Sequence, residues 1–168
     1  MGAWSKNLLQ VISVGPGEMK VTNDMNACLA SNSLGSCLAV AVYDAEAHVG
    51  GLLCTVLPDM EFDPEMALQN PSLFATSGIP QLFRRCYKHG AKKERMECYL
   101  IGGADVFDES GSYCPGRENY EKALEVLENN GVTVKAEFVG GVENRRVRLY
   151  AGDGKVVICN NRGEELEP

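Results

Sequence analysis

The stretch CLAVAVYDAEAHVGGLLCTVLPD, residues 37–59, holds two β-prone apolar runs separated by the short polar segment AEAH. Two such runs joined by a short loop predict an antiparallel β-hairpin. We place its turn at Ala45 and Glu46. In that register Cys37 and Cys54 lie directly opposite each other, with Cβ atoms about 4.5–5.5 Å apart.

Cys37 is a candidate nucleophile because it follows a Leu-Gly-Ser turn and precedes the first strand of the hairpin. A thiol at the start of a strand, behind a flexible glycine loop, can reach a substrate, whereas one deep in a strand is usually inert. A cysteine nucleophile also needs a base or a positive neighbour, most often histidine. The chain has two histidines, which we interpret as a loop residue, His48, and a charge at the end of a helix, His89.

The rest of the chain alternates between strand and helix patterns. Length and hydrophobic content, 168 residues and 45%, predict one domain over residues 1–168. We expect no regular secondary structure in three segments: residues 60–78, which are interrupted by polar and turn residues, a polar loop after the GPGE turn, and a frayed tail at 160–168. The regular elements are expected as helices at 80–88 and 117–131 and as strands at 8–14, 132–139, 145–150 and 155–159, the last three forming a meander. The segment 97–107 is expected as a strand that runs into a turn at Gly102 and Gly103.

Composition limits the classes of partner. The net charge of −7 and the pI near 4.9 argue against an electrostatic grip on nucleic acid or anionic lipid. Seven cysteines without a CxxC pair, and no early apolar segment with a cleavage site, indicate a reducing cytoplasm. No apolar run approaches the roughly 18 residues that span a bilayer. We expect a cytoplasmic protein with no nucleic-acid partner, no membrane insertion, no cofactor and no metal.

A series of motifs runs along most of the chain: GPGE (15–18), LGSC (34–37), VLPD (56–59), HGAKKERMECYLIGGADVF (89–107), a helix bearing Asn119, VGG (139–141), RRV (145–147) and DGKVVIC (153–159). In this order and spacing they resemble the family of CheD, the chemoreceptor glutamine deamidase of bacterial and archaeal chemotaxis. The resemblance implies an α+β fold of mixed β-sheets flanked by helices, related to the catalytic domain of cytotoxic necrotising factor toxins.

The resemblance also implies a chemistry. The family's cysteine attacks the side-chain amide of selected receptor glutamines, a histidine assists proton transfer, ammonia leaves, and water hydrolyses the acyl-enzyme to glutamate. Carried over by position, the nucleophile is Cys37, Ser31 stands where the family has threonine, and Cys54 stands where it has histidine. The implied partners are the cytoplasmic helices of a chemoreceptor and, for some members, a CheC-like phosphatase.

Five further residues are expected near the substrate or the oxyanion: Gly35, Ser36, Gly102, Gly103 and Asn119. The two glycines at 102 and 103 either present N–H groups to an oxyanion or simply form a tight exit from a strand. Asn119 follows a glutamate where the family has arginine, which reverses a charge near the expected substrate face.

Position 54 leaves three hypotheses open. A thiol cannot replace imidazole as a base near neutral pH, and a second thiolate would raise the pKa of the Cys37 thiol. The chain is therefore an active deamidase with another base, a non-catalytic adaptor that binds a chemoreceptor or a CheC-like phosphatase, or a redox or metal-binding protein built on Cys37 and Cys54. Simple packing of two small apolar side chains explains the cysteine pair equally well.

Overall fold

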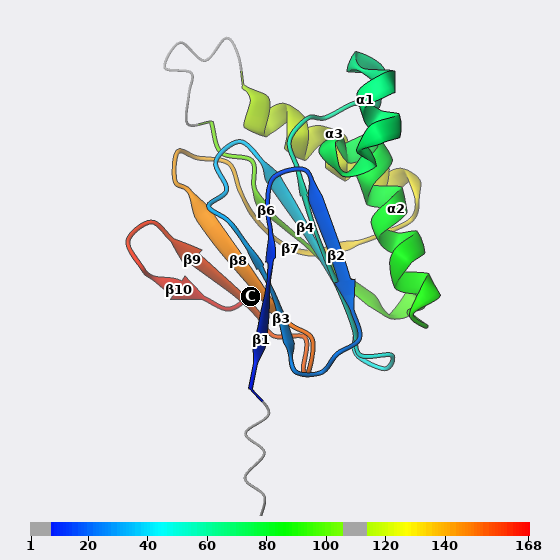
Figure 1. The fold of residues 1–168 in the computed structure, drawn as a ribbon. Helices are drawn as coiled ribbons and strands as arrows, with labels where there is room; N and C mark the ends of the chain where they lie inside the picture. The colour runs from blue at the N-terminus through cyan, green and yellow to red at the C-terminus, as the bar shows by residue number, and fades with distance from the viewer. Residues whose placement is uncertain (1–7, 106–113) are drawn as a thin grey trace, which may run out of the picture.

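The computed structural model describes residues 8–105 and 114–168. Two five-stranded β-sheets pack face to face, and helices cover the outer face of one of them (Figure 1). Both sheets contain parallel and antiparallel strand pairs. The expected α+β class, with mixed sheets flanked by helices, is therefore confirmed.

The first sheet has the strand order β1 (Gln10–Val14), β3 (Ala27–Ser31), β8 (Arg145–Tyr150), β9 (Val156–Asn160) and β10 (Glu165–Leu166). Its first pair is parallel and the others are antiparallel. The second sheet has the order β2 (Glu18–Thr22), β5 (Val49–Thr55), β4 (Leu38–Asp44), β6 (Met96–Gly102) and β7 (Val134–Val139). Here β6 and β7 run parallel and the other pairs antiparallel.

The helical layer contains α1 (Pro64–Gln69), α2 (Ala75–Lys88), α3 (Pro115–Asn129) and the short 3₁₀ helices η1 (Met60–Phe62), η2 (Pro71–Leu73) and η3 (Lys93–Arg95). Alternate residues of the central strands divide the core in two. Val40 faces the helices with Leu82 and Leu127, whereas Ala41 faces the other sheet with Leu149. Burial on both faces explains why β4 and β5 read as nearly continuous apolar runs.

The hairpin forms as expected, but its register differs by two residues. Asp44 pairs with Val49, so that the turn spans 45–48 and Ala39, not Cys37, lies opposite Cys54. The Asp44 side chain accepts hydrogen bonds from the two backbone N–H groups at 46 and 47 and so stabilises the longer turn. The turn closes with a residue at positive φ, +53° at position 48.

Two further expectations about local structure were wrong. The segment 60–78 is not irregular, because it forms η1, α1, η2 and the start of α2, which begins at Ala75 and contains Pro80. These helices are too short to show a period, and side-chain caps from Asp59 and Asp63 mark them instead. The expected polar loop after the GPGE turn contains β2 and β3.

The C-terminal strands are not a meander. β7 joins the second sheet beside β6, whereas β8 and β9 pair in the first sheet, so the chain crosses between sheets after Val139. The tail is not frayed throughout, because β10 pairs with β9. The expected strand at 8–14 and helix at 117–131 are confirmed as β1 and α3. The expected strand that runs into the Gly102-Gly103 turn is confirmed as β6, whereas the end of the segment 97–107, including Phe107, lies outside the described residues.

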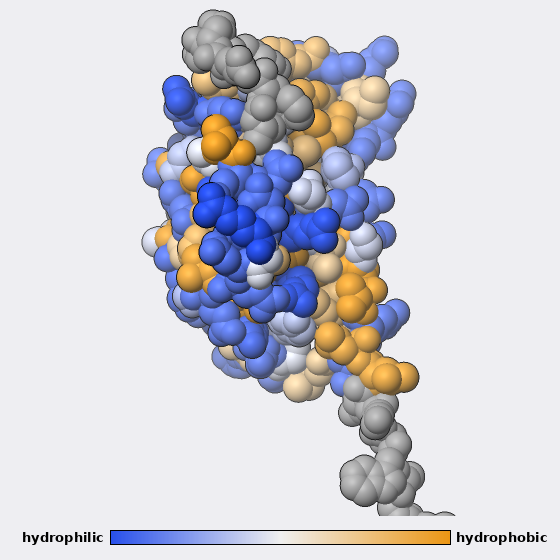
Figure 2. All heavy atoms as spheres, turned by 90° about the vertical axis from the view of Figure 1, so that its left-hand side faces the viewer, coloured by the Kyte–Doolittle hydropathy of each residue, from blue (hydrophilic) through white to orange (hydrophobic). Residues whose placement is uncertain are grey.

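Figure 2 views the molecule from the side of β9 and β10, where hydrophilic residues cover most of the surface. Exposed apolar side chains from the N-terminal edge include Leu8, Leu9 and Val11. In residues 8–105 and 114–168 no helix combines the length and apolar character needed to cross a membrane.

Candidate active site

Cys37 occupies the loop immediately before β4 and is half-buried against the core between the sheets. Backbone hydrogen bonds fix this loop to the residues that follow β6. Gly103 N–H donates to Cys37 O, and Ala104 N–H donates to Gly35 O, both at 2.9 Å. The backbone of the LGSC turn is therefore held by a second segment of the chain.

The two glycines at the end of β6 are required by this close approach. Gly102 and Gly103 have φ values of +103° and +60°, and a Cβ on Gly102 would overlap the Cys37 carbonyl oxygen. Because the Gly103 N–H already donates to that carbonyl, it is not a free donor for an oxyanion. Of the two interpretations of this pair, the tight strand exit agrees with the geometry.

Asn119 connects both sides of the candidate site. Its side chain is fully buried, and its Nδ2 donates to Ser36 O and to Val56 O, each at 2.9 Å. Ser36 precedes the candidate nucleophile, and Val56 is the residue that faces Cys37 when the register of β4 and β5 is continued. The Asn119 Oδ1 atom is buried and has no hydrogen-bond partner among the described residues. Asn119 therefore positions the backbone on each side of Cys37.

Cys54 shares the face of β4 and β5 that carries Cys37, because the register shift of two residues preserves the face. Its side chain is 1% exposed, and its Sγ donates to Val14 O at 3.7 Å. Burial, followed by the charges of Cys37 and Glu18, raises the pKa of the Cys54 thiol to about 12. Cys54 is therefore a neutral thiol at pH 7 and cannot accept a proton from Cys37.

The candidate nucleophile is itself not activated. Burial raises the pKa of the Cys37 thiol, and the influence that acts in the other direction is a hydrogen bond within its own residue. Since the thiolate is the reactive form, Cys37 is mainly the less reactive thiol at pH 7.

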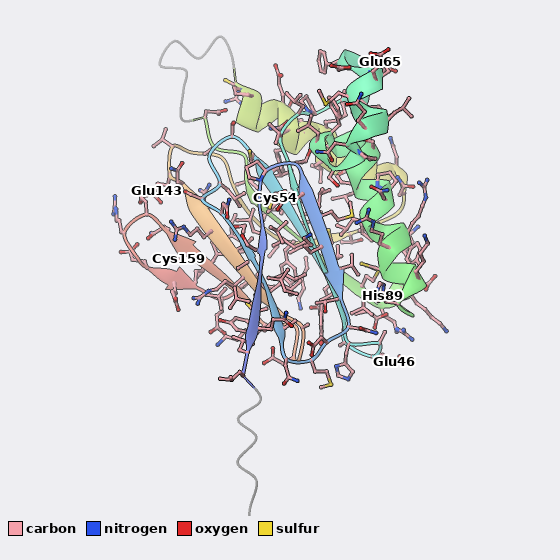
Figure 3. All side chains as sticks on the ribbon, in the orientation of Figure 1. Glu46, Cys54, Glu65, His89, Glu143 and Cys159 are labelled. Atoms are coloured by element: carbon pink, nitrogen blue, oxygen red, sulfur yellow. The ribbon has the colours of Figure 1, made fainter. Side chains whose placement is uncertain are left out.

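Neither histidine is close enough to assist. Figure 3 shows Cys54 near one end of the second sheet and His89, like Glu46 of the hairpin turn, near the other. His48 lies six residues before position 54, about 20 Å along an extended strand at 3.3 Å per residue. His89 caps α2 on the helical face of the sheet, opposite to the face that carries Cys54.

Ser31 ends β3 beside the cysteine pair. It is buried and lies opposite Val14 in the pairing of β1 with β3. The Val14 carbonyl oxygen accepts a hydrogen bond from the Cys54 thiol. The Ser31 Oγ accepts a hydrogen bond from Val147 N–H at 3.0 Å and so connects β3 to β8. The sequence did not indicate the parts played by the Val14 and Val56 carbonyls, because a backbone contact leaves no signal in residue type.

Both cysteines of the pair are free thiols in the structure. Diagonal neighbours on adjacent strands are about 7–8 Å apart. Disulfides usually need Cα atoms within about 4.4–6.8 Å. Within the described part of the chain, no three histidine, cysteine or acidic side chains are arranged to hold a metal ion.

Comparison with known proteins supports the resemblance seen in the motifs. The family model of CheD, described as CheD chemotactic sensory transduction, matches residues 56–160. A probable chemoreceptor glutamine deamidase, CheD 2 of Anaeromyxobacter dehalogenans, is 37% identical over 95% of this chain and 99% of its own length. CheD 1 of Syntrophus aciditrophicus, also named a probable chemoreceptor glutamine deamidase, is 38% identical over 90% and 95%.

Solved structures give a weaker likeness. The Neisseria meningitidis protein NMB0706 superposes with a TM-score of 0.45 at 14% identity, over 79% of this chain and 63% of that one. The family model and the curated relatives agree along most of the chain. The chain therefore belongs to the CheD family.

Proposed function

We propose that this protein is a cytoplasmic, chemoreceptor-binding member of the CheD family in which glutamine deamidation by Cys37 is slowed by the absence of a base. The substrate class comes from the names of its relatives, which are probable chemoreceptor glutamine deamidases. The observation that carries the proposal is the buried Cys54 thiol at the family's histidine position, with His48 in the hairpin turn and His89 at the end of α2.

The reaction that the scaffold supports is acyl transfer to a thiol. Cys37 Sγ attacks the carbon of a glutamine carboxamide, ammonia leaves with a proton, and water cleaves the resulting thioester to give glutamate and the free thiol. A general base contributes about 10²–10⁴-fold to such a reaction, so its absence predicts a rate lower by about that factor. Positioning by Asn119 and by the glycines at the end of β6 remains available.

The surroundings of Cys54 are suited to an imidazole. Val14 O accepts a hydrogen bond from the Cys54 thiol, and it would accept one from a ring N–H of a histidine at position 54. That hydrogen bond would fix the tautomer and leave the other ring nitrogen as an acceptor on the face shared with Cys37.

The test is a mass-spectrometric deamidation assay on the cytoplasmic fragment of a chemoreceptor. Wild type, Cys37→Ser and Cys54→His are compared by the number of glutamines converted to glutamate. We expect slow conversion by wild type, none by Cys37→Ser and faster conversion by Cys54→His. Fast conversion by wild type, abolished in Cys37→Ser, would show that another base operates and would overturn the proposal.

Receptor binding is measured separately, in a pull-down with the receptor fragment, for wild type and for Cys37→Ser, which lacks the thiol nucleophile. Binding equal to that of wild type, with no conversion by either protein, indicates a pure adaptor. Absence of binding by both proteins would reject the chemoreceptor as partner. Binding of a CheC-like phosphatase stays a prediction, and the same pull-down tests it with the phosphatase in place of the receptor fragment.

A further inference from the structure

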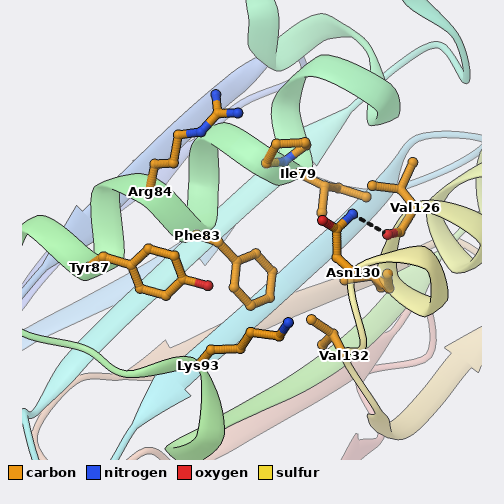
Figure 4. Close-up of a pocket in the computed structure, with 10 residues that line it drawn as sticks. Ile79, Phe83, Arg84, Tyr87, Lys93, Val126, Asn130 and Val132 are labelled. Carbon is orange, nitrogen blue, oxygen red and sulfur yellow. Dashed lines mark hydrogen bonds between the residues drawn. The ribbon is translucent and has the colours of Figure 1, made fainter.

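A groove lies between α2 and α3 on the helical side of the molecule, away from the cysteine pair (Figure 4). Its walls include the apolar side chains of Ile79, Phe83, Val126 and Val132, and its volume is about 140 Å³. In another protein, an engineered cavity of about 150 Å³ holds a benzene molecule. The groove therefore has room for one medium-sized apolar side chain.

Two cations line this groove. Arg84 and Lys93 line it, and Figure 4 shows them on opposite sides of the Phe83 ring. Three further exposed cations, Arg85, Lys88 and Lys92, stand at the end of α2 or just after it. Within the described residues, none of the five cations forms an ion pair.

The cluster is local in a chain of opposite overall charge. Residues 84–95 contain six lysines or arginines and one glutamate, a balance of +5 against −7 for the whole chain. The sixth cation, Arg95, is neutralised by Asp44 and Glu46. Arg84 and Lys93 line the apolar groove and form no ion pair within the described residues, so they are complementary to a ligand that has one apolar anchor between carboxylates.

We propose that the groove between α2 and α3 binds an acidic amphipathic helix of a partner protein, with an apolar side chain in the cavity and carboxylates on Arg84 and Lys93. An amphipathic helix in an apolar groove is a recurrent mode of peptide recognition. The acidic surface of the rest of the chain opposes an extended polyanion such as nucleic acid or an anionic membrane. The proposal does not depend on the chemistry of Cys37, which lies on the other face of the second sheet.

The probe is a fluorescent synthetic helix with leucines at positions i, i+3 and i+7 and glutamates on both flanks. Binding is followed by fluorescence anisotropy with the full chain. Reversal of both rim charges, Arg84→Glu with Lys93→Glu, is expected to weaken binding by about tenfold or more. The matched control is Arg146→Glu, an exposed arginine of β8 that also lacks an ion pair among the described residues, and it should bind as wild type does.

Two further arms identify the contacts. Val132→Asp places a carboxylate in the wall of the groove and should weaken binding as strongly as the double variant, with circular dichroism as the check of folding. A peptide with lysines in place of its glutamates should not bind. Salt should weaken the complex, since the Debye length falls to about 3 Å at 1 M.

Several results would overturn the proposal. One is equal binding of the acidic peptide to the double variant and to wild type. The others are failure of the acidic peptide to bind wild type, and binding of the lysine peptide as strong as that of the acidic peptide. Stronger binding to vesicles of equal parts phosphatidylserine and phosphatidylcholine than to the peptide, lost in the same double variant, would assign the surface to a membrane instead. None of these results bears on deamidation, so the two proposals fail separately.

Discussion

Replacing Asn119 with alanine tests how the backbone around Cys37 is held. The substitution removes donors from two carbonyls, Ser36 O and Val56 O, which now accept hydrogen bonds of 2.9 Å inside the protein. A buried acceptor left without a donor costs about 1–3 kcal/mol. The buried Asn119 Oδ1 has no partner among the described residues, so its removal offsets part of this cost. We expect Asn119→Ala to lower the free energy of unfolding by about 2–4 kcal/mol.

Urea denaturation measures this change, and the helix supplies its own control. Asn130 lies at the end of α3, is exposed, and donates to Val126 O at 2.7 Å. Because water can replace that hydrogen bond, Asn130→Ala should cost less than about 1 kcal/mol. Asn119→Asp should destabilise more at pH 7 than at pH 4, because its ionised carboxylate would face two carbonyl oxygens.

A second readout separates positioning of Cys37 from general stability. Alkylation by iodoacetamide, resolved by peptide mass spectrometry, should become faster at Cys37 in Asn119→Ala under native conditions, because the loop is released from α3. Cys86, which is fully buried, should stay unreactive in the same sample. The reasoning is refuted if Asn119→Ala remains within about 0.5 kcal/mol of wild type, the range of an ordinary surface substitution, and alkylates Cys37 at the same rate.

Three further predictions follow from the geometry. The Asp44 carboxyl is buried, which opposes ionisation, but Arg95 and three backbone N–H groups outweigh burial and lower its pKa from 3.8 to about 2. That difference in pKa stabilises the fold by about 2 kcal/mol above pH 4, and this stabilisation is lost as the pH falls from about 4 to about 2. Asp44→Asn should therefore flatten the dependence of the free energy of unfolding on pH between about pH 4 and pH 2. An unchanged pH profile would exclude the Asp44 carboxyl as the source of that dependence. Gly102→Ala should destabilise by about 2–4 kcal/mol, more than Gly90→Ala, because both positions have positive φ but a Cβ at Gly90 meets nothing within 4 Å; equal losses in thermal unfolding would show that the close approach carries no cost. Mild oxidation should leave Cys37 and Cys54 unlinked, since diagonal neighbours are too far apart for a direct disulfide, and a linked peptide in non-reducing mass spectrometry would contradict the register.

The sequence predicts long apolar elements better than short polar ones. The hairpin strands, buried on both faces, and α3, with its apolar stripe and its stop at Gly131, have clear patterns and are confirmed. β2 and β3 have five residues each and read as loop, since their pairing with distant strands cannot be seen locally. The sheet that β7 joins was likewise decided by long-range packing, because its parallel partner β6 comes from before α3.

The sequence predicts candidate residues for the site but not the distances between them. The LGSC motif indicates Cys37 before the structure is known, and the face shared with Cys54 survives the error in register because the shift is an even number. What failed is the assumption of a two-residue turn. The Asp44 side chain accepts hydrogen bonds from two backbone N–H groups and so stabilises a longer turn. In the resulting register the residue opposite Cys37 is Val56 and not Cys54.

The surroundings of position 54 decide whether the site is weakened or lost. Val14 O, the acceptor that would orient an imidazole at position 54, is in place. Asn119 holds the backbone at Ser36 and Val56, on the two sides of Cys37. Gly102 permits the close approach of the Cys37 carbonyl oxygen. Position 54 itself holds a buried thiol with a raised pKa in place of a base. An imidazole is larger than a thiol and position 54 is 1% exposed, so Cys54→His should cost about 1–3 kcal/mol of stability by overpacking. A variant that gains deamidation rate while it loses stability is therefore the expected result, and a gain in neither rate nor Cys37 reactivity in a folded variant would mean that the remaining parts are not arranged for catalysis.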